Sequence, residues 1–458
     1  MEFVDSPRVR INAVLEIELS ANELVSALLR ISETEPVYIL DSCGVGHLGS
    51  HLLIAALRPI ETFEISPDDP NTTLRLLDDK LSHDQAAIFT LSYDFGSKLQ
   101  PISKRKEYAD LDEPDLFLAT FEQLMIHDYD SGKTYFAGDE AASSSIREVL
   151  LSRAEGSSFE LPKGEPARVR SNFSKTDYIA GVERIREYIR SGDTYQTNLT
   201  QQLRCTLSAD TTPASIYWRL RRDHPAPFSA FLKRPHSTVI SASPERFFRI
   251  SRDGSIEASP IKGTRARGNT QDADLRLRSE LASSTKDRAE NTMIVDLVRN
   301  DLGRVCEYGS VSVEKLCDIE EHPTLFHLVS TVRGHLRDDS KVSDILRAVF
   351  PCGSITGAPK IRTMQIIDEI ETASRGSSMG AIGVYLPASW DLGNALLDTV
   401  IDSSVAIRTM VVRGRDAVFN IGGGIVIDSD PENEFEESLL KARSLLNAIG
   451  TGYSGSDV

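Results

Sequence analysis

Two strand-like segments that fold back across short turns constrain this fold more than any other feature. Residues 239–251 and 255–262 flank a turn that contains Asp-Gly, the preferred two-residue turn between antiparallel strands. A similar segment spans residues 404–427, with its turn at 413–416. Because helical patterns lie between these hairpins, the sequence predicts an α+β fold with mainly antiparallel sheets, rather than a doubly wound parallel sheet.

Domain organisation follows from one change in composition. Residues 153–172 are rich in Gly, Pro, Ser and charged side chains, which is typical of a linker. We therefore expect an N-terminal region at 1–152, a larger catalytic domain at 173–450 and a flexible tail at 451–458.

The start of the larger domain carries a clear helix signal. Ser174 followed by Asp177 is typical of a helix N-terminus, and Tyr178, Val182 and Ile185 follow at helical spacing. The sequence therefore predicts an amphipathic helix directly after the linker.

The charge balance bears on the partners. A net charge of −17, from 51 basic and 68 acidic residues, disfavours binding to nucleic acid or to an anionic membrane. An anionic small molecule stays possible, because a pocket can be locally basic. No apolar run approaches the ~20 residues of a membrane span, and the charged N-terminus lacks a signal-peptide core. The five scattered cysteines favour reduced thiols, so we expect a cytoplasmic protein.

A glutamate and a lysine meet across the first hairpin if its turn has two residues. Asp253 and Gly254 at the turn would place Glu245 directly opposite Lys262, with Cβ atoms roughly 4.5–5.5 Å apart. A slip of one residue would separate them. Such a pair is most often an exposed ion pair of little energetic weight. The alternative is a partly buried lysine that loses its proton near neutral pH and acts as a nucleophile.

Two predicted helices carry glutamates near their starts. One contains Glu290. The other begins at Asp430 and Pro431 and contains Glu434 and Glu437, with Lys441 on the same side. Glutamates in these positions commonly do no more than complement the helix dipole, and the residues alone favour that interpretation. The functional alternative is a Mg²⁺ site, because carboxylates from separate elements, together with substrate oxygens and water, suit this ion.

Backbone that could bind an anion occurs in two places. The run Gly422, Gly423 and Gly424 permits close approach and can direct N–H groups toward a carboxylate or phosphate. The segment 353–360, GSITGAPK, contains Ser354 and precedes a predicted helix, which makes it a second candidate.

Three further residues are candidates for a functional role. The second hairpin places Arg408 opposite Ile421, beside the glycine run. His327 lies among apolar residues, where a lone histidine is usually a core residue with its hydrogen bonds satisfied. Cys43, in CGVGH, superficially resembles a nucleophilic elbow, but no partner motif follows it, so we interpret this segment as a loop.

Several motifs together resemble the chorismate-utilising enzymes, and their order and spacing agree over about residues 172–448. They are SGDTYQTNLTQ (191–201), APFSAF (226–231), SPERF (243–247), PIKGT (260–264), DRAENTMIVDLVRNDLGRV (287–305), LFHLVSTVRG (325–334) and GSITGAPKIRTMQIIDEIE (353–371). The resemblance implies two stacked, mainly antiparallel sheets flanked by helices, with the N-terminal region packed onto the same unit.

Two positions distinguish branches of this family. Members that add water to chorismate carry lysine where this chain has Gln196, and ammonia-using members carry glutamine. Anthranilate-forming members read PIAGT, whereas PIKGT, with Lys262, resembles the aminodeoxychorismate branch. The resemblance thus implies amination of chorismate to 4-amino-4-deoxychorismate, a precursor of p-aminobenzoate and folate. Anthranilate synthesis is the alternative activity, and a catalytically silent chorismate- or tryptophan-binding subunit is the alternative of another class.

The resemblance also implies catalytic and binding roles. Lys262 would attack ring carbon C2, and Glu245 would protonate the departing C4 hydroxyl, with His327 beside it. The implied substrate-binding residues are Ser354, Arg408, Gly422, Gly423, Gly424, Lys441 and Gln196.

A metal, a partner and a second ligand are also implied. Glu290 and Glu437 would hold Mg²⁺, with Glu434 as a nearby or water-mediated ligand. A separate glutamine amidotransferase subunit would supply ammonia. The segment YILDS (38–42) resembles the region where relatives bind tryptophan, which stays open for this chain. Relatives often carry tyrosine at the position of Ser378, so we expect the enolpyruvyl end of the pocket to be shaped differently in this chain.

Overall fold

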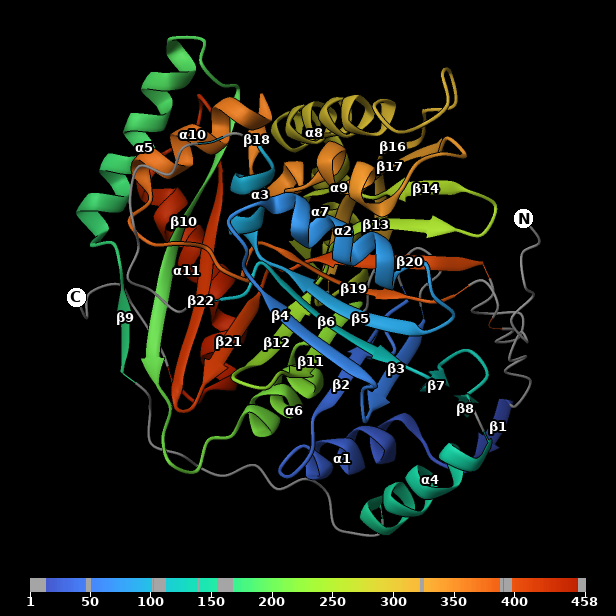
Figure 1. The fold of residues 1–458 in the computed structure, drawn as a ribbon. Helices are drawn as coiled ribbons and strands as arrows, with labels where there is room; N and C mark the ends of the chain where they lie inside the picture. The colour runs from blue at the N-terminus through green and yellow to red at the C-terminus, as the bar shows by residue number, and fades with distance from the viewer. Residues whose placement is uncertain are drawn as a thin grey trace.

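Two large β-sheets organise the chain in the computed structural model (Figure 1). The structure describes residues 14–46, 51–100, 102, 113–138, 140–154, 168–321, 325–387, 390 and 398–451. The strands of both sheets pair in antiparallel fashion, and helices flank them, which confirms the predicted α+β class.

The first sheet has 12 strands. In spatial order they are β1 (Val14–Ile17), β8 (Lys133–Gly138), β7 (Gln123–Asp128), β3 (Leu52–Leu57), β2 (Val37–Asp41), β11 (Phe228–Lys233), β12 (Thr238–Ser243), β21 (Thr409–Arg413), β22 (Asp416–Ile425), β10 (Gln196–Thr206) and β18 (Gly357–Ala358), with β9 (Val169–Ser171) beside β10.

The second sheet has 10 strands. Their order is β15 (Ile261–Ala266), β17 (Leu325–His335), β14 (Ser255–Ala258), β13 (Arg246–Ser251), β20 (Thr399–Val405), β19 (Ala381–Tyr385), β5 (Ala86–Leu91), β6 (Leu116–Phe121) and β4 (Glu61–Ile65), with β16 (Ser312–Glu321) beside β17.

Helices cover the outer faces of the two sheets (Figure 1). Their bounds are α1 (Ala21–Ile31), α2 (Pro70–Lys80), α3 (Tyr93–Leu99), α4 (Glu140–Ala154), α5 (Lys175–Arg190), α6 (Pro213–Asp223), α7 (Gln271–Ser283), α8 (Thr285–Gly303), α9 (Val342–Val349), α10 (Lys360–Ile370) and α11 (Pro431–Ala448). None of these helices has the length and hydropathy of a membrane span.

Apolar side chains fill three layers. Helices α1, α5, α6 and α11 pack on the first sheet, and α2, α3, α8 and α9 pack on the second. A third cluster joins the sheets to each other; in it Tyr38 of β2 stacks on Phe117 of β6, with ring centroids 5.8 Å apart. The two sheets are therefore stacked on each other, and helices cover their outer faces.

Strands from the N-terminal region enter both sheets. In the first sheet β2 pairs with β11, and in the second β5 pairs with β19. Of the predicted linker, Arg153 lies in α4 and Val169–Ser171 form β9, whereas 155–167 lie outside the described residues, as does the tail from 452.

The helix signals are confirmed at three places. The Ser174 hydroxyl accepts a hydrogen bond from the Asp177 N–H, and α5 begins at Lys175. Asp430 caps α11 by accepting from the Asn433 N–H. Helix α8, which carries Glu290, begins at Thr285.

The predicted register of the first hairpin is wrong. Arg249 lies opposite Glu257, one residue away from the expected pairing. The loop has three residues, and Gly254 takes a left-handed φ of 79°, as the last residue of such loops commonly does. Because β14 then ends and β15 pairs with β17, Glu245 and Lys262 are not cross-strand partners.

The second hairpin has the expected register. Arg413 lies opposite Asp416, and the pairing continues through Met410 and Phe419. Extended by two residues, this register places Arg408 opposite Ile421, although β21 itself begins at Thr409.

Candidate active site

Lys262 lies at a break in strand pairing. On β15, Ile261 pairs with Val329 of β17, but the next pair is Thr264 with His327, and the shifted residues between them are Lys262 and Gly263. Bulges of this kind re-aim a side chain beside many active sites. Lys262 is partly buried, which agrees with the alternative interpretation of this lysine rather than with an exposed ion pair.

Glu245 is a buried carboxyl beside this lysine. The residue is 5% exposed, and its Oε1 atom has no hydrogen-bond partner in the described part of the chain. Burial raises the pKa of Glu245 to about 7, although the Ser354 hydroxyl, the Lys262 ammonium and the Ile261 N–H favour the charged form. A carboxyl that still holds a proton near neutral pH can act as a general acid. The structure therefore brings Glu245 and Lys262 together despite the wrong register.

His327 faces a polar partner. It is 4% exposed on β17, and its Nδ1 atom lies 2.9 Å from the Thr264 hydroxyl, two residues beyond Lys262. The histidine is therefore buried with a hydrogen bond, and it lies on the strand that supports the lysine.

The three glutamates lie where α8 approaches α11. Lys286 connects the helices, because its Nζ atom lies 3.9 Å from both Glu290 Oε1 and Glu434 Oε1. Burial raises the pKa of Glu290 and that of Glu434. Burial also acts to raise the pKa of Glu437, but the Lys441 ammonium, 2.8 Å away, holds it below its usual range.

These carboxylates fit a magnesium ion by their chemistry. The charge of Glu434 further raises the pKa of Glu290, and that of Glu437 further raises the pKa of Glu434, so the groups repel one another. A divalent cation would relieve this repulsion. Among the described residues, no three acidic, His or Cys side chains already converge on one point. Mg²⁺ needs only one or two carboxylates when water and substrate supply the rest.

The glycine run lies against these side chains. Gly424 pairs with Asn198 in a ladder of ten consecutive partners between β10 and β22. A Cβ atom on Gly423 would lie 3.3 Å from Glu434 Oε2 and 3.4 Å from Lys441 Nζ. The Lys441 ammonium also donates to the Gly422 carbonyl at 3.1 Å. Glycine here lets the charged groups reach the backbone.

Gln196 is the first residue of β10, the strand that pairs with the glycine run. Its side chain is fully buried, and neither atom of its amide has a hydrogen-bond partner among the described residues. A Cβ atom on Gly424 would come within 2.6 Å of the Gln196 Nε2 atom. Because an unpaired buried amide is costly, this side chain is available to a polar ligand.

Arg408 and Ser378 lie beside the part of β22 that precedes the glycine run. In the described part of the chain, no hydrogen bond or ion pair holds the Arg408 guanidinium or joins it to the glutamates, and burial lowers its pKa. Its φ of 49° is left-handed. The Ser378 hydroxyl accepts from the Asn420 N–H at 3.2 Å, so this serine is tied to the strand that carries the glycine run.

Sequence reasoning missed two groups near the candidate active site, a lysine and an ion pair. Lys286 lies four residues before Glu290, and this helical spacing could have indicated the contact. A buried ion pair between Glu371 and Arg375 also has this spacing.

Cys43 is in a turn, as predicted, and burial raises the pKa of its thiol to about 12.

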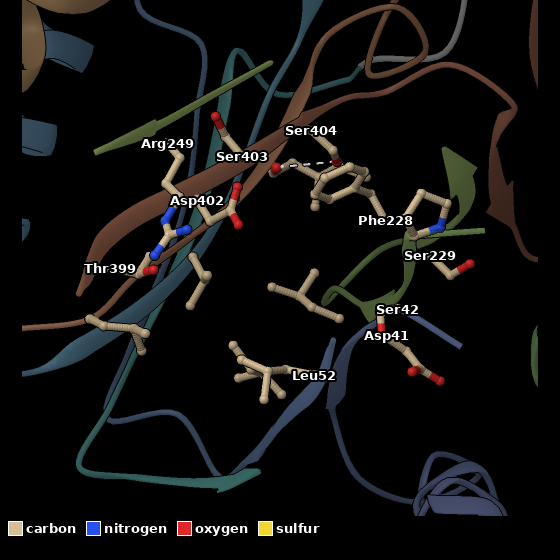
Figure 2. A pocket seen from close by; sticks show the side chains of 17 residues that line it. Asp41, Ser42, Leu52, Phe228, Ser229, Arg249, Thr399, Asp402, Ser403 and Ser404 are labelled. Atoms are coloured by element: carbon tan, nitrogen blue, oxygen red, sulfur yellow. Dashed lines mark hydrogen bonds between the residues drawn. The ribbon is translucent and has the colours of Figure 1, made fainter. Parts of the chain in front are cut away.

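A separate pocket of about 80 Å³ lies between the two sheets (Figure 2). Asp41 on its wall accepts from Arg221 at 2.7 Å and from the Tyr129 hydroxyl at 2.8 Å. The buried Nε atom of Arg249 has no such partner in the described ranges. The other polar and aromatic residues labelled in Figure 2 are Ser42, Phe228, Ser229, Thr399, Asp402, Ser403 and Ser404.

Comparison with known proteins identifies the family of this chain. The family model for chorismate binding enzymes matches residues 35–447. The chain is 36% identical to aminodeoxychorismate synthase component 1 of Klebsiella aerogenes over 416 residues, which is 88% of each protein. It is 40% identical to aminodeoxychorismate synthase of Streptomyces griseus over 357 residues, 75% of this chain and 48% of that protein. The chain thus spans about half the length of that relative.

The fold also matches a solved structure. Anthranilate synthase component I from Streptococcus pneumoniae superposes with a TM-score of 0.74 at 28% identity, covering 88% of this chain and 93% of that chain. These similarities confirm the family resemblance and the stacked-sheet fold.

Proposed function

This chain belongs to the family of chorismate binding enzymes, and from that premise we propose that it aminates chorismate with ammonia, in the presence of Mg²⁺, to 4-amino-4-deoxychorismate. Such an activity would make it an aminodeoxychorismate synthase component I, a transferase. The observation that supports this most is the buried Glu245 carboxyl, with its pKa raised to about 7, beside the Lys262 amine.

The first step breaks the bond between C4 and its hydroxyl. After Lys262 releases its proton to solvent, its amine forms a bond to C2, the ring double bonds shift, and the C4–O bond breaks. Glu245 gives its proton to the departing oxygen, which leaves as water. His327, held by Thr264, maintains the shape of this side of the pocket.

The second step introduces nitrogen at C4. Ammonia forms the new C–N bond, the double bonds shift back, and the Lys262 amine leaves C2. The proton that ammonia loses restores Glu245, so that chorismate and ammonia yield aminodeoxychorismate and water. The Gln196 amide, which has unpaired polar atoms, is suited to orienting ammonia.

The remaining residues bind and orient the substrate. Glu290 and Glu437 would hold Mg²⁺, with Glu434 close by, and a bound ion would neutralise charge on the ring carboxylate. Arg408 is suited to the enolpyruvyl carboxylate because its planar guanidinium can donate two parallel hydrogen bonds. Substrate contacts also come from Ser354, Gly422, Gly423, Gly424 and Lys441.

Incubation with chorismate, Mg²⁺ and ammonium tests this activity. Chromatography should detect aminodeoxychorismate without pyruvate release. Fluorescent anthranilate together with pyruvate would replace our proposal by the alternative activity, which the Streptococcus fold match favours. Chorismate binding without turnover in high ammonium would indicate a silent subunit.

We propose a glutamine amidotransferase subunit as the source of ammonia in the cytoplasm. Adding that subunit should allow glutamine to replace ammonium. Glutamine-dependent turnover by this chain alone would contradict the partner proposal. The product would serve as a precursor of p-aminobenzoate and folate.

Tryptophan binding is a separate question for the pocket in Figure 2, since Asp41 and Ser42 of the YILDS segment line it. Titration calorimetry with tryptophan answers it, and an Arg249→Ala variant localises any heat of binding to this pocket.

A further inference from the structure

A buried ion pair beside the candidate active site has no part in the proposed chemistry. Glu371 directly follows α10, and Arg375 lies four residues later; each is 3% exposed. Arg375 Nη2 lies 2.7 Å from Glu371 Oε1, and Nε lies 3.0 Å from Oε2, so the pair is bidentate. Buried pairs of this kind often add little net stability, because desolvation offsets their attraction.

The rest of the Arg375 guanidinium reaches two backbone carbonyls. Nη1 donates to the Ile355 carbonyl at 2.7 Å, and Nη2 donates to the Asn198 carbonyl at 2.8 Å. The ring of Tyr93 on α3 lies 4.4 Å from the guanidinium carbon and covers it. The planar guanidinium therefore bonds at the same time to the chain segment at Ile355 and to the segment at Asn198.

Both of these segments adjoin residues of the candidate active site. Ile355 follows Ser354, whose hydroxyl acts on the Glu245 carboxyl. Asn198 pairs with Gly424 and lies two residues from Gln196. One side chain thus joins the segment beside the catalytic acid to the strand that carries the unpaired amide.

The carboxylate partner anchors the same strand. Glu371 Oε1 accepts from the Thr200 N–H at 2.7 Å and from the Thr200 hydroxyl at 2.9 Å. Since Thr200 pairs with Gly422, the anchor lies directly behind the glycine run.

We propose that Arg375 is a positioning residue, which fixes the distance between the Ser354 segment and strand β10, and so between the two sides of the chorismate pocket. A lysine cannot replace it, because an ammonium lacks the planar fork that serves two carbonyls and a carboxylate together. The readout of this proposal rests on the proposed function.

The test compares Arg375→Lys with Arg234→Lys. Arg234 is also buried, but within the described residues its hydrogen bonds go to Ser237, Ser377 and Glu113 (2.6 Å) and not to Ile355 or Asn198. Arg375→Lys should lower kcat about 10- to 100-fold with a smaller change in the KM for chorismate, because displacements near 1 Å can cost that much. Arg234→Lys should leave kcat unchanged.

A pH profile separates positioning from a general loss of structure. If the Ser354 hydroxyl moves away, it no longer lowers the pKa of Glu245, so the fall in kcat should occur at higher pH in Arg375→Lys. An unchanged kcat and profile in a folded Arg375→Lys variant would overturn the proposal.

Two further results keep the outcome interpretable. If Arg375→Lys does not fold, Glu371→Gln, which keeps the shape but weakens the anchor, should shift kcat and the profile in the same direction; an unchanged enzyme would overturn the inference. If the wild-type chain makes no product from chorismate, the proposed function fails instead, and that result is distinct from an active wild type with an unaffected variant.

Discussion

The two sides of the candidate active site are built differently; we call the β10–β22 side the regular wall and the β15–β17 side the irregular wall. On one wall, β10 and β22 pair over ten residues without a shift, and Gln196 at its edge is fully buried. On the other, the pairing of β15 with β17 breaks at Lys262 and Gly263, and Lys262 is only partly buried. The regular wall offers fixed backbone and small residues for binding, whereas the irregular wall aims a reactive side chain.

The difference extends to the supporting helices. Helix α11, behind the regular wall, buries residues along its length, including Phe435, Leu439 and Leu446. Helix α7, beside β15, buries only Leu281. Because α7 buries so little, we expect this helix to open locally at lower free energy than α11, although α8 also packs on β15. The following changes probe this contrast.

Removing the amine from the irregular wall should have the largest effect. Lys262→Ala should lower the rate of aminodeoxychorismate formation about 10³-fold, because the covalent step is lost. Mg²⁺ should still bind to this variant in calorimetry, because the proposed ligands Glu290 and Glu437 remain in place. Normal turnover in this variant would remove the covalent step from the mechanism.

Neutralising the acid should come next. Glu245→Gln should lower kcat about 10²-fold, because no proton reaches the departing hydroxyl. In the wild type, kcat should fall as pH rises through about 7, the pKa of Glu245. If the wild-type profile is flat from pH 6 to 8, Glu245 is not the acid.

The same residue links stability to pH. The folded state holds the proton that the unfolded state releases near pH 4.5, so the free energy of unfolding should decline between pH 4.5 and 7, by up to about 3 kcal/mol. Urea titrations should show that Glu245→Gln removes this decline. A parallel decline in both proteins would assign it to other groups.

A methyl group added to the regular wall tests whether the position of the Gln196 amide matters. Gly424→Ala places a methyl group 2.6 Å from the Gln196 amide, which must move aside. The KM for ammonium should rise about 10-fold, if this amide orients ammonia. Gly303→Ala, with no neighbour within 4 Å of its added methyl group, is the matched control. Equal kinetics for both variants would leave Gln196 without a role.

Adding a methyl group at the bulge of the irregular wall should have the smallest effect on turnover and should act mainly on stability. Gly263→Ala must hold φ at 84° and brings a methyl group 2.9 Å from Leu281 Cδ1 and Asp287 Cγ. Thermal unfolding should show a loss of about 1–3 kcal/mol. Gly309→Ala has a similar φ of 81° but open space, so the difference between the variants isolates the contacts. Equal losses would mean that backbone strain alone accounts for the glycine.

Much of the fold was predictable from local signals. The cap at Ser174 predicted α5, and Asp430 marked the start of α11. The second hairpin has the predicted register because only two residues, Gly414 and Arg415, separate its paired ends. The first hairpin failed because Gly254 closes a three-residue loop, which composition does not distinguish from a two-residue turn.

The candidate site was predictable as a set of residues but not as a geometry. The motifs pointed to Glu245, Lys262 and Glu290, yet the route by which the first two meet was wrong. They meet because β15 leaves its hairpin and pairs with β17, and pairings of this kind depend on the whole sheet.

The sequence by itself determined the helix ends, the antiparallel class and the residue types available for chemistry, because caps, turns and apolar periods act over a few residues. Only the tertiary structure decided that Glu245 is buried enough to hold a proton near pH 7 and that Lys286 connects two helices. The same holds for Arg375, which reaches carbonyls 20 and 177 residues away. Desolvation and long-range hydrogen bonds depend on what packs around a group, which no local pattern specifies.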